Sequence, residues 1–341
     1  MFLLRSVSMS DTKDLYHLSQ LVLFINLPPD EAIIQKKVES SVRAFQKPDK
    51  RFWKNYYLFV IEDLNTNQVV GVSMIHAQHG TEEEPHYFFK VGQEHKFSRT
   101  INTGFIHGTL KLGLDTDGPT EIGGLVIDPS FRKTPHKIGK QISFVRFLYM
   151  SIFPDRFKTM IHSELMPPLD KHGNSPLWEA IGRRFLNMGY QEADELSRSN
   201  KEFILNLFPS DTIYETLLPL EARNAIGKVG IDTEPVKKML AGIGFKYMDE
   251  VDPFDGGPHY RARLEDISLI KEKEQGYLNI NKKLDEQNAR QALITINHGS
   301  HDFAATMALV NVNGDEVVIE ESVRNYFNLK EKELTHLIYL D

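Results

Sequence analysis

A basic loop between an apolar strand and an apolar helix is the first place where this sequence could do chemistry. The strand, Glu121–Ile127, ends at Asp128-Pro129, and the helix covers about residues 139–153. The first amides of a helix lack partners within it and its dipole is positive there, so such a loop attracts anions, and glycine admits a bulky phosphate. The residues expected to hold a pyrophosphate are Lys137, Ile138, Gly139 and Lys140. A basic surface loop before an ordinary helix is the alternative interpretation.

Three further side chains could move a proton. His162 and Glu164 are two residues apart in an expected strand, 159–166, so both point to the same face. His259 follows the turn-prone run Phe254-Asp255-Gly256-Gly257-Pro258. Each can act as a general acid or base. The pair could instead be a satisfied polar pair at a sheet end, and His259 could be a structural histidine.

Other charged residues are candidates for holding a substrate. Asp252 and Asp255 could bind a guanidinium through charge-assisted hydrogen bonds, or could serve only the turn that they flank. Arg184, beside Arg183 on an expected helix, could meet a carboxylate or could simply be solvated. These alternatives stay open at the level of the sequence.

The elements around these residues predict an α/β fold with a mixed, mostly antiparallel sheet flanked by helices. Phe2–Val7, Tyr56–Glu62 and Val69–Ala77 are expected strands, the last two joined by the turn Asn65-Thr66-Asn67. Helices are expected at Thr12–Val22, from Pro28 to about Phe45, and at Pro235–Ile243. A short extended stretch is expected near Tyr87–Val91.

The order of these elements predicts one large domain and one small one. Residues 1–262 are expected to form the large domain, with a mostly helical insertion at about 167–230. The polar stretch 271–291 is interpreted as a connection. Beyond it, expected strands at Gln291–Ile296, Ala304–Val312 and Glu316–Glu320 indicate a small β-rich accessory domain within residues 263–341.

The composition narrows the class of protein. The formal net charge of −7 predicts no binding to nucleic acid or to an anionic membrane. The chain has no cysteine, which excludes thiol catalysis and disulfides and makes the cytoplasm the expected location. Few of the 13 histidines stand at metal-ligand spacing, and His298 and His301 lack an obvious third ligand, so no metal is expected.

Several motifs then point to a family. The strand, Asp128-Pro129-Ser130-Phe131-Arg132, the anion loop and the helix together resemble the coenzyme A-binding motif of the GNAT acyltransferases. Across residues 1–262 the sequence is similar to the arginine N-succinyltransferase family, at residues 175–180 and 251–258 among others, and most specifically at Phe254-Asp255-Gly256-Gly257-Pro258. The resemblance implies that Leu125, Val126 and Ile127 hold the pantetheine arm and that a strand amide near Leu125 or Val126 polarises the thioester.

The implied reaction moves a succinyl group from succinyl-CoA to the α-amino group of arginine, with acyl-CoA as a co-substrate and no permanently bound cofactor.

Two departures from the family stand out. The loop from Arg132 to Lys140 keeps only the last glycine, and Gly230 occupies the place of the family's proposed catalytic histidine. The alternatives are an acyltransferase with another acyl donor or amine, or a non-catalytic coenzyme A-binding partner. A homo- or hetero-oligomer is compatible with all three.

Overall fold

The computed structural model describes residues 1–21, 27–198, 200–299 and 301–340. The chain divides into two compact units: the first contains Met1–Gln78, Thr120–Thr159 and Arg263–Asp341, and the second contains His79–Pro119 and Met160–Ala262. Within the described ranges, every helix is too short or too polar to cross a membrane. Each unit has its own run of strands and its own core, and these are described in turn.

The sheet of the first unit is antiparallel, as the sequence predicts. Its strands follow the order β1 (Phe2–Ser6), β2 (Tyr56–Asp63), β3 (Gln68–His76) and β6 (Thr120–Ile127). The expected hairpin between β2 and β3 is confirmed, and its turn residue Asn67 adopts a left-handed φ of 54°. Asparagine tolerates that conformation better than most residues, which explains its place there.

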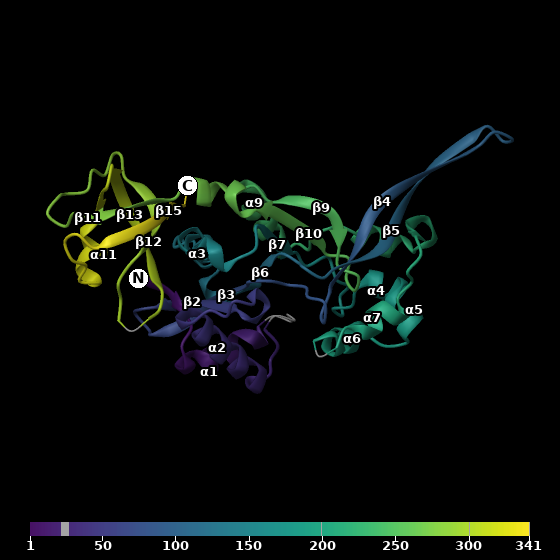
Figure 1. The fold of residues 1–341 in the computed structure, drawn as a ribbon, viewed down its shortest axis with the longest axis horizontal. Coiled ribbons are helices and arrows are strands. Elements are labelled where there is room, and N and C mark those ends of the chain that lie inside the picture. The colour runs from purple at the N-terminus through teal and green to yellow at the C-terminus, as the bar shows by residue number, and fades with distance from the viewer. Residues whose placement is uncertain (22–26, 199, 300, 341) are drawn as a thin grey trace. The chain divides into compact units, whose positions relative to one another are not determined.

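Helices cover both faces of this sheet (Figure 1). Helices α1 (Thr12–Gln20) and α2 (Glu31–Gln46) pack their apolar residues on β2 and β3, while α3 (Ile138–Ile152) packs on the opposite face. Ring contacts of Tyr149 on α3 with Phe59 on β2, 5.3 Å between centroids, join helix to strand. The sequence placed the end of α1 at Val22, which lies outside the described residues.

The C-terminal strands belong to this same unit. They are β11 (Glu274–Leu278), β12 (Arg290–Thr295), β13 (Ala304–Asn313), β14 (Glu316–Ile319) and β15 (Leu334–Tyr339), accompanied by α10 (Ser268–Lys271) and α11 (Glu321–Tyr326). Their pairings run β12-β15-β11-β14-β13 and close through β12–β13. Strand β13 also pairs with β1, where Leu4 lies opposite Ala305.

Two expectations about this tail need correction. The structure does not divide the chain at residue 262, because β13 extends the sheet of β1 and Leu3 lies in the same apolar cluster as the C-terminal strands. The polar stretch 271–291 is not only a connection, because it contains β11. That strand buries only Gly276 and Leu278, so its sequence carries little apolar signal.

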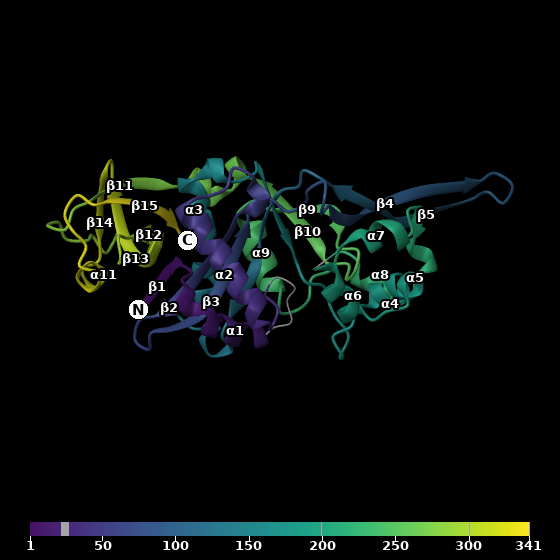
Figure 2. The same cartoon turned by 60° about the horizontal axis from the view of Figure 1, so that its bottom comes forward.

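The sheet of the second unit runs in the order β7 (Met160–Glu164), β10 (Pro258–Arg263), β9 (Lys246–Val251), β4 (His86–Ser98), β5 (Thr103–Asp115) and β8 (Ile213–Tyr214). Strands β4 and β5 pair along their whole length and form the long ribbon labelled in Figures 1 and 2. The sequence predicted only a short stretch near Tyr87–Val91. Much of the ribbon is solvent-exposed on both faces, which removes the alternation of buried and exposed residues by which strands are recognised.

Short helices fill most of the segment expected to be a helical insertion: α4 (Pro176–Ala180), α5 (Gly182–Leu186), α6 (Tyr190–Ser197), α7 (Glu202–Leu207) and α8 (Leu220–Ala225). They pack around the fully buried Trp178, whose indole N–H donates to the Met188 carbonyl at 3.0 Å. Helix α9 (Glu234–Gly242) follows and ends just before Gly244, whose φ of 108° suits glycine.

Candidate functional site

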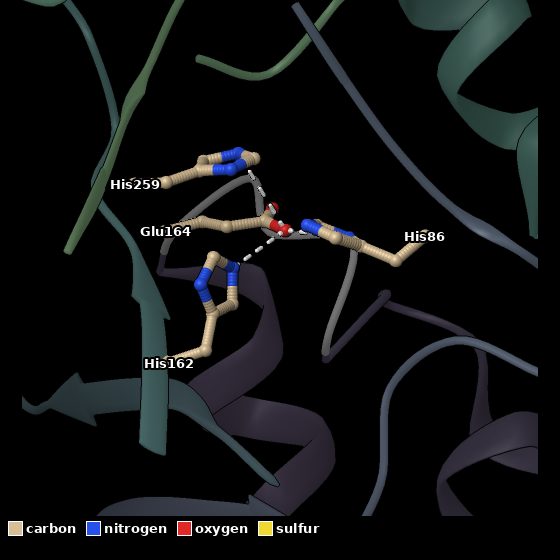
Figure 3. Close-up of side chains that lie close together, drawn as sticks. All are labelled: His86, His162, Glu164 and His259. Carbon is tan, nitrogen blue, oxygen red and sulfur yellow. Dashed lines mark hydrogen bonds and ion pairs between the residues drawn. The ribbon is translucent and has the colours of Figure 1, made fainter. Parts of the chain in front are cut away.

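Four side chains from three separate segments of the second unit meet around one carboxylate. His162 and Glu164 lie on β7, His259 lies on β10, and His86 begins β4. The strand order β7-β10-β9-β4 brings these segments together. We call His86, His162, Glu164 and His259 the histidine cluster. Figure 3 shows the three imidazoles arranged about the Glu164 carboxylate.

The distances within the histidine cluster are short. Glu164 Oε1 lies 3.3 Å from His162 Nε2, 3.6 Å from His86 Nδ1 and 3.9 Å from His259 Nε2. The three histidines are almost completely buried, whereas the Glu164 side chain keeps 31% of its surface exposed. The cluster is therefore largely buried, and Glu164 is its partly exposed member.

Hydrogen bonds determine which nitrogen of His162 carries its proton. Arg261 Nε–H donates to His162 Nδ1 at 3.1 Å, so Nδ1 is the acceptor. The proton of the neutral ring is then on Nε2, which donates to Glu164. His162 thus orients the carboxylate. His259, in contrast, has two buried ring nitrogens with no hydrogen-bond partner among the described residues.

The electrostatics of the cluster separate the charged group from the neutral ones. Burial would raise the pKa of Glu164, but the hydrogen bond from His162 and the influence of His259 and His86 hold that pKa well below its ordinary value. Burial lowers the pKa of His86 far below its usual range and that of His259 to about 3. At neutral pH Glu164 is therefore an ionised carboxylate beside the uncharged imidazoles of His86 and His259.

A second carboxylate supports His259 from the other side. Strands β9 and β10 change register around His259, and Asp249 adopts a φ of 52° in this bulge. Glu250 Oε2 consequently lies 4.0 Å from His259 Nδ1 and 2.9 Å from Arg261. Bulges re-aim side chains and are frequent beside active sites. A proton on His259 would have a carboxylate near each ring nitrogen.

The aspartates expected to hold a substrate cation lie in one loop of the same unit. Asp252 Oδ1 accepts the amides of Phe254 and Asp255 at 2.7 and 3.0 Å, and Asp255 Oδ1 accepts the Gly257 amide at 2.7 Å. One oxygen of each carboxylate therefore does the turn chemistry that the sequence allowed as the alternative. The Oδ2 oxygens take no part in those turn bonds, and the Tyr190 hydroxyl reaches Asp255 Oδ2 at 3.5 Å.

These aspartates share an environment that resists negative charge. Burial and the charge of Glu164 raise the pKa of Asp252 to about 7, and burial raises the pKa of nearby Asp194 to about 6. Burial and Asp252 raise the pKa of Asp255 well above its ordinary value. A cation bound among Asp194, Asp252 and Asp255, which we call the aspartate group, would relieve this repulsion.

Arg184 is not among the residues that these contacts bring together. Its side chain is exposed on α5, and the contact described for it is a backbone bond to Ile181. Its expected role as a partner of a substrate carboxylate stays a prediction.

The expected coenzyme A site belongs to the first unit and contains a second bulge. Val126 on β6 pairs with Val72 and Gly123 pairs with Met74, so Gly124 and Leu125 together face Ser73. Gly124 has a φ of 57°. Neither Gly124 nor Leu125 is a one-to-one partner of Ser73 in the β3 ladder. Val126 is buried in the core, while Leu125 and Ile127 are half-buried.

The anion loop is held by its own hydrogen bonds before α3 begins. Lys137 has a φ of 52° at the start of the helix, and its carbonyl accepts the amides of Lys140 and Gln141. The amides of Ile138 and Gly139 stand in the first turn, beyond the reach of a helical acceptor. The Lys137 ammonium donates to Gln291, and the Lys140 ammonium donates to the Leu340 carbonyl. The loop therefore also contacts the C-terminal strands.

Gly230, expected from the resemblance to stand at the place of the family's histidine, has no room for a side chain. Its amide donates to the Met166 carbonyl at 2.9 Å, and a Cβ at this position would lie 2.9 Å from the Pro167 carbonyl oxygen.

Gly230→His is therefore expected to lower the melting temperature by several degrees and not to raise turnover, because a backbone oxygen must move. A thermal melt measures this, with Gly242→Ala as control, since nothing lies within 4 Å of a Cβ there. A stable, faster enzyme would contradict it.

The sequence did not reveal His86, Glu250 or Asp194 as members of these groups. His86 follows an acidic turn and carries no local motif. Its one sequence-level signal is its place at the edge of an expected strand, which does not say which other strands lie beside it. Long-range strand pairing makes these residues neighbours.

Comparisons with known proteins agree with this architecture. A sequence model described as "Arginine N-succinyltransferase beta subunit" matches residues 2–269. Proteins named arginine N-succinyltransferase from Shigella dysenteriae serotype 1 (strain Sd197) and Escherichia coli O139:H28 are each 29% identical over 322 residues, 94% of this chain and 92% of theirs.

A solved structure is similar along the whole length. It is described as arginine/ornithine succinyltransferase subunit AI from Pseudomonas aeruginosa and is 25% identical, with a TM-score of 0.85 over 100% of this chain and 99% of that one. Because the family match spans most of the sequence and both units, the chain belongs to the arginine N-succinyltransferase beta subunit family and is an acyl-CoA-dependent N-acyltransferase.

Proposed function

We propose that this protein transfers the succinyl group of succinyl-CoA to the α-amino group of arginine in amino acid catabolism in the cytoplasm. The observation that carries the proposal is the juxtaposition, within one unit, of a proton-handling cluster around Glu164 and an aspartate group suited to a cationic side chain. The names of the relatives supply the acyl group and the amine.

The histidine cluster is proposed to take the proton of the attacking amine. An α-amino group with a pKa of about 8 is largely protonated at neutral pH, so the nucleophile must lose a proton before or during attack. His259 is the proposed acceptor because its ring nitrogens have no hydrogen-bond partner among the described residues and each of them faces a carboxylate. Glu164 and Glu250 would stabilise the imidazolium, and His162 would orient Glu164.

The bond changes then follow those of any thioester aminolysis. The amine nitrogen attacks the succinyl carbonyl carbon, and the carbonyl oxygen becomes an oxyanion. A strand amide near Leu125 or Val126 is proposed to donate to that oxyanion, as the family resemblance implies. Collapse forms the amide bond and breaks the C–S bond, and the proton taken from the amine is returned to the thiolate of coenzyme A.

A thiol-release assay tests the proposal. The purified protein with succinyl-CoA and arginine should release coenzyme A thiol faster than either substrate alone allows, and the product should be N-succinylarginine. Release with another acyl-CoA or amine, but not with this pair, would favour an acyltransferase of different specificity. Coenzyme A binding without thiol release in any combination of substrates would favour a non-catalytic subunit. A glycine at position 230, where the resemblance places the family's histidine, favours the same interpretation.

Asp252 is expected to set the pH dependence of cation binding. The pKa of about 7 means that Asp252 is largely protonated below neutral pH and cannot then pair with a guanidinium. Methylguanidine, whose charge does not titrate in this range, should therefore inhibit more strongly as the pH rises from about 6 to about 8. Asp252→Asn should weaken its inhibition about tenfold or more above pH 7, since a hydrogen bond to a charged group contributes about 1.5–3 kcal/mol.

The inhibition constant of methylguanidine, measured across that pH range, checks both expectations. Asp211→Asn, which changes an exposed aspartate of the same unit, is the matched control. Equal inhibition by methylguanidine in the wild type and Asp252→Asn would place the cation elsewhere.

Charge reversal in the anion loop is expected to weaken coenzyme A binding. The double variant Lys137→Glu/Lys140→Glu should raise the dissociation constant of coenzyme A at least about tenfold at low salt, because two cations beside the pyrophosphate become anions. Isothermal titration measures the effect. Lys158→Glu, in the same unit but outside the loop, serves as control. Unchanged affinity in the double variant would rule out this placement.

A further inference from the structure

The histidine cluster has a donor set that its proposed role in proton transfer does not require. One carboxylate oxygen and three imidazole nitrogens lie within 4.8 Å of one another, and three of the four residues are buried. Proton transfer needs one base and one partner. Imidazole nitrogens and a carboxylate that converge from three segments are instead a combination that suits zinc, cobalt, nickel or iron.

We propose that the histidine cluster binds a divalent first-row transition metal ion through His86 Nδ1, His259 Nε2 and Glu164 Oε1. The inference goes beyond the proposed function, because binding of the ion does not depend on succinyl transfer. Three protein ligands leave a position for water, as in sites built from two histidines and one glutamate.

The geometry supports these three ligands in particular. Metal–nitrogen and metal–oxygen bonds of about 2.1 Å place two ligand atoms about 3.0–3.4 Å apart. The Glu164 oxygen lies 3.6 Å from the His86 nitrogen and 3.9 Å from the His259 nitrogen. Side-chain rotations that move the ligand atoms by up to about half an ångström bring both distances into the range of about 3.0–3.4 Å. Figure 3 shows both rings turned toward the carboxylate.

Unsatisfied polar atoms give independent support. Both ring nitrogens of His259 are buried and have no hydrogen-bond partner among the residues that the structure describes. Burying a polar atom without a partner costs about 1–3 kcal/mol, so an ion on His259 Nε2 would remove the penalty at that atom. A metal ion would take one nitrogen of each ring, and the other would carry the proton.

His162 has a different place in this site. Because Arg261 donates to its Nδ1, its Nε2 holds a proton and donates to Glu164 rather than offering a lone pair. It is therefore a positioning residue that orients the metal-binding carboxylate, as the partners of metal ligands commonly do. Arg261 also forms an ion pair with Glu250 at 2.9 Å, which holds its guanidinium in place to donate to His162.

Cobalt provides a direct test. The full chain is first treated with a chelator and then titrated with Co²⁺. We expect visible d–d absorption bands that saturate at one Co²⁺ per chain and disappear when Zn²⁺ displaces it. Saturating Zn²⁺ should also raise the melting temperature of the wild type, because the ion binds only the folded site.

Variants identify the ligands. His86→Gln and His259→Gln keep most of the side-chain volume, and each should weaken Co²⁺ binding at least about tenfold and remove the rise in melting temperature caused by Zn²⁺. His298→Gln, in the first unit, is the matched control and should bind Co²⁺ like the wild type. If His86→Gln does not fold, the His259→Gln titration and the wild-type stoichiometry still decide.

Two results would overturn the proposal: absence of the cobalt bands in the wild type, or bands that persist unchanged in both cluster variants. Thiol release is measured separately on the chelator-treated protein, because an ion on His259 would occupy the lone pair proposed to accept the amine proton. Loss of metal binding and loss of succinyl transfer are thus distinguishable.

Discussion

Glu164→Gln should lower kcat for thiol release with succinyl-CoA and arginine by about 10²–10⁴-fold, the usual range for loss of a group that supports proton transfer. The amide keeps the shape of the carboxylate but cannot stabilise a protonated His259 at 3.9 Å. The residues expected to hold the pyrophosphate, Lys137 to Lys140, belong to the other unit, so the KM for succinyl-CoA should change little. Steady-state kinetics measure both parameters.

The matched control is Glu179→Gln, which removes an exposed i,i+4 ion pair with Arg183 in the same unit. Exposed pairs of this kind contribute about 0.3–0.5 kcal/mol, so its kcat should stay near that of the wild type. A thermal melt of both variants separates loss of chemistry from loss of folding. A folded Glu164→Gln protein with wild-type kcat would remove the histidine cluster from the mechanism.

A chain shortened to end at Asp266 should fail to fold into a soluble protein. The cut removes β13, the neighbour of β1, and exposes Leu3 and the face of α3 that α10 covers. It also removes Phe303, whose ring contacts Phe59 and Tyr149 at 5.7 and 5.2 Å. Each such side chain contributes about 1.5–3 kcal/mol, and several together exceed a typical stability of about 5–15 kcal/mol.

Soluble yield and far-UV circular dichroism measure this outcome. Co-expression of residues 267–341 as a separate chain is the control, since a missing part of the same core should restore solubility when it is supplied in trans. A soluble shortened chain with a cooperative melt, able to bind coenzyme A, would instead support the separable accessory domain that the sequence predicted.

The fold class and the anion loop were accessible from the sequence because both depend on local patterns. Apolar, β-branched and aromatic residues predict β2 and β3. The run from Asp128 to Gly139 indicates the end of a strand, a basic loop and the start of a helix. The pairing of His162 with Glu164 followed from the two-residue period of a strand and appears in the structure as a 3.3 Å contact.

The long ribbon and strand β11 were less accessible than the other elements, because they lack a local signal. Strand β11 buries only two residues, and β5 exposes side chains on both faces. The expected boundary at residue 262 missed that β1, the first strand, takes β13 as a neighbour some 300 positions later. No periodicity within either strand encodes that partnership.

The sequence by itself therefore determined the family, the class of fold and the residue types available for acid–base work and anion binding. Long-range packing alone brings His86 to His162, Glu164 and His259, and it leaves no space for a side chain at Gly230. The physical reason is that a site of this kind is made by side chains from strands distant in sequence. Their neighbours are chosen by the packing of the whole sheet, which no short window of residues contains.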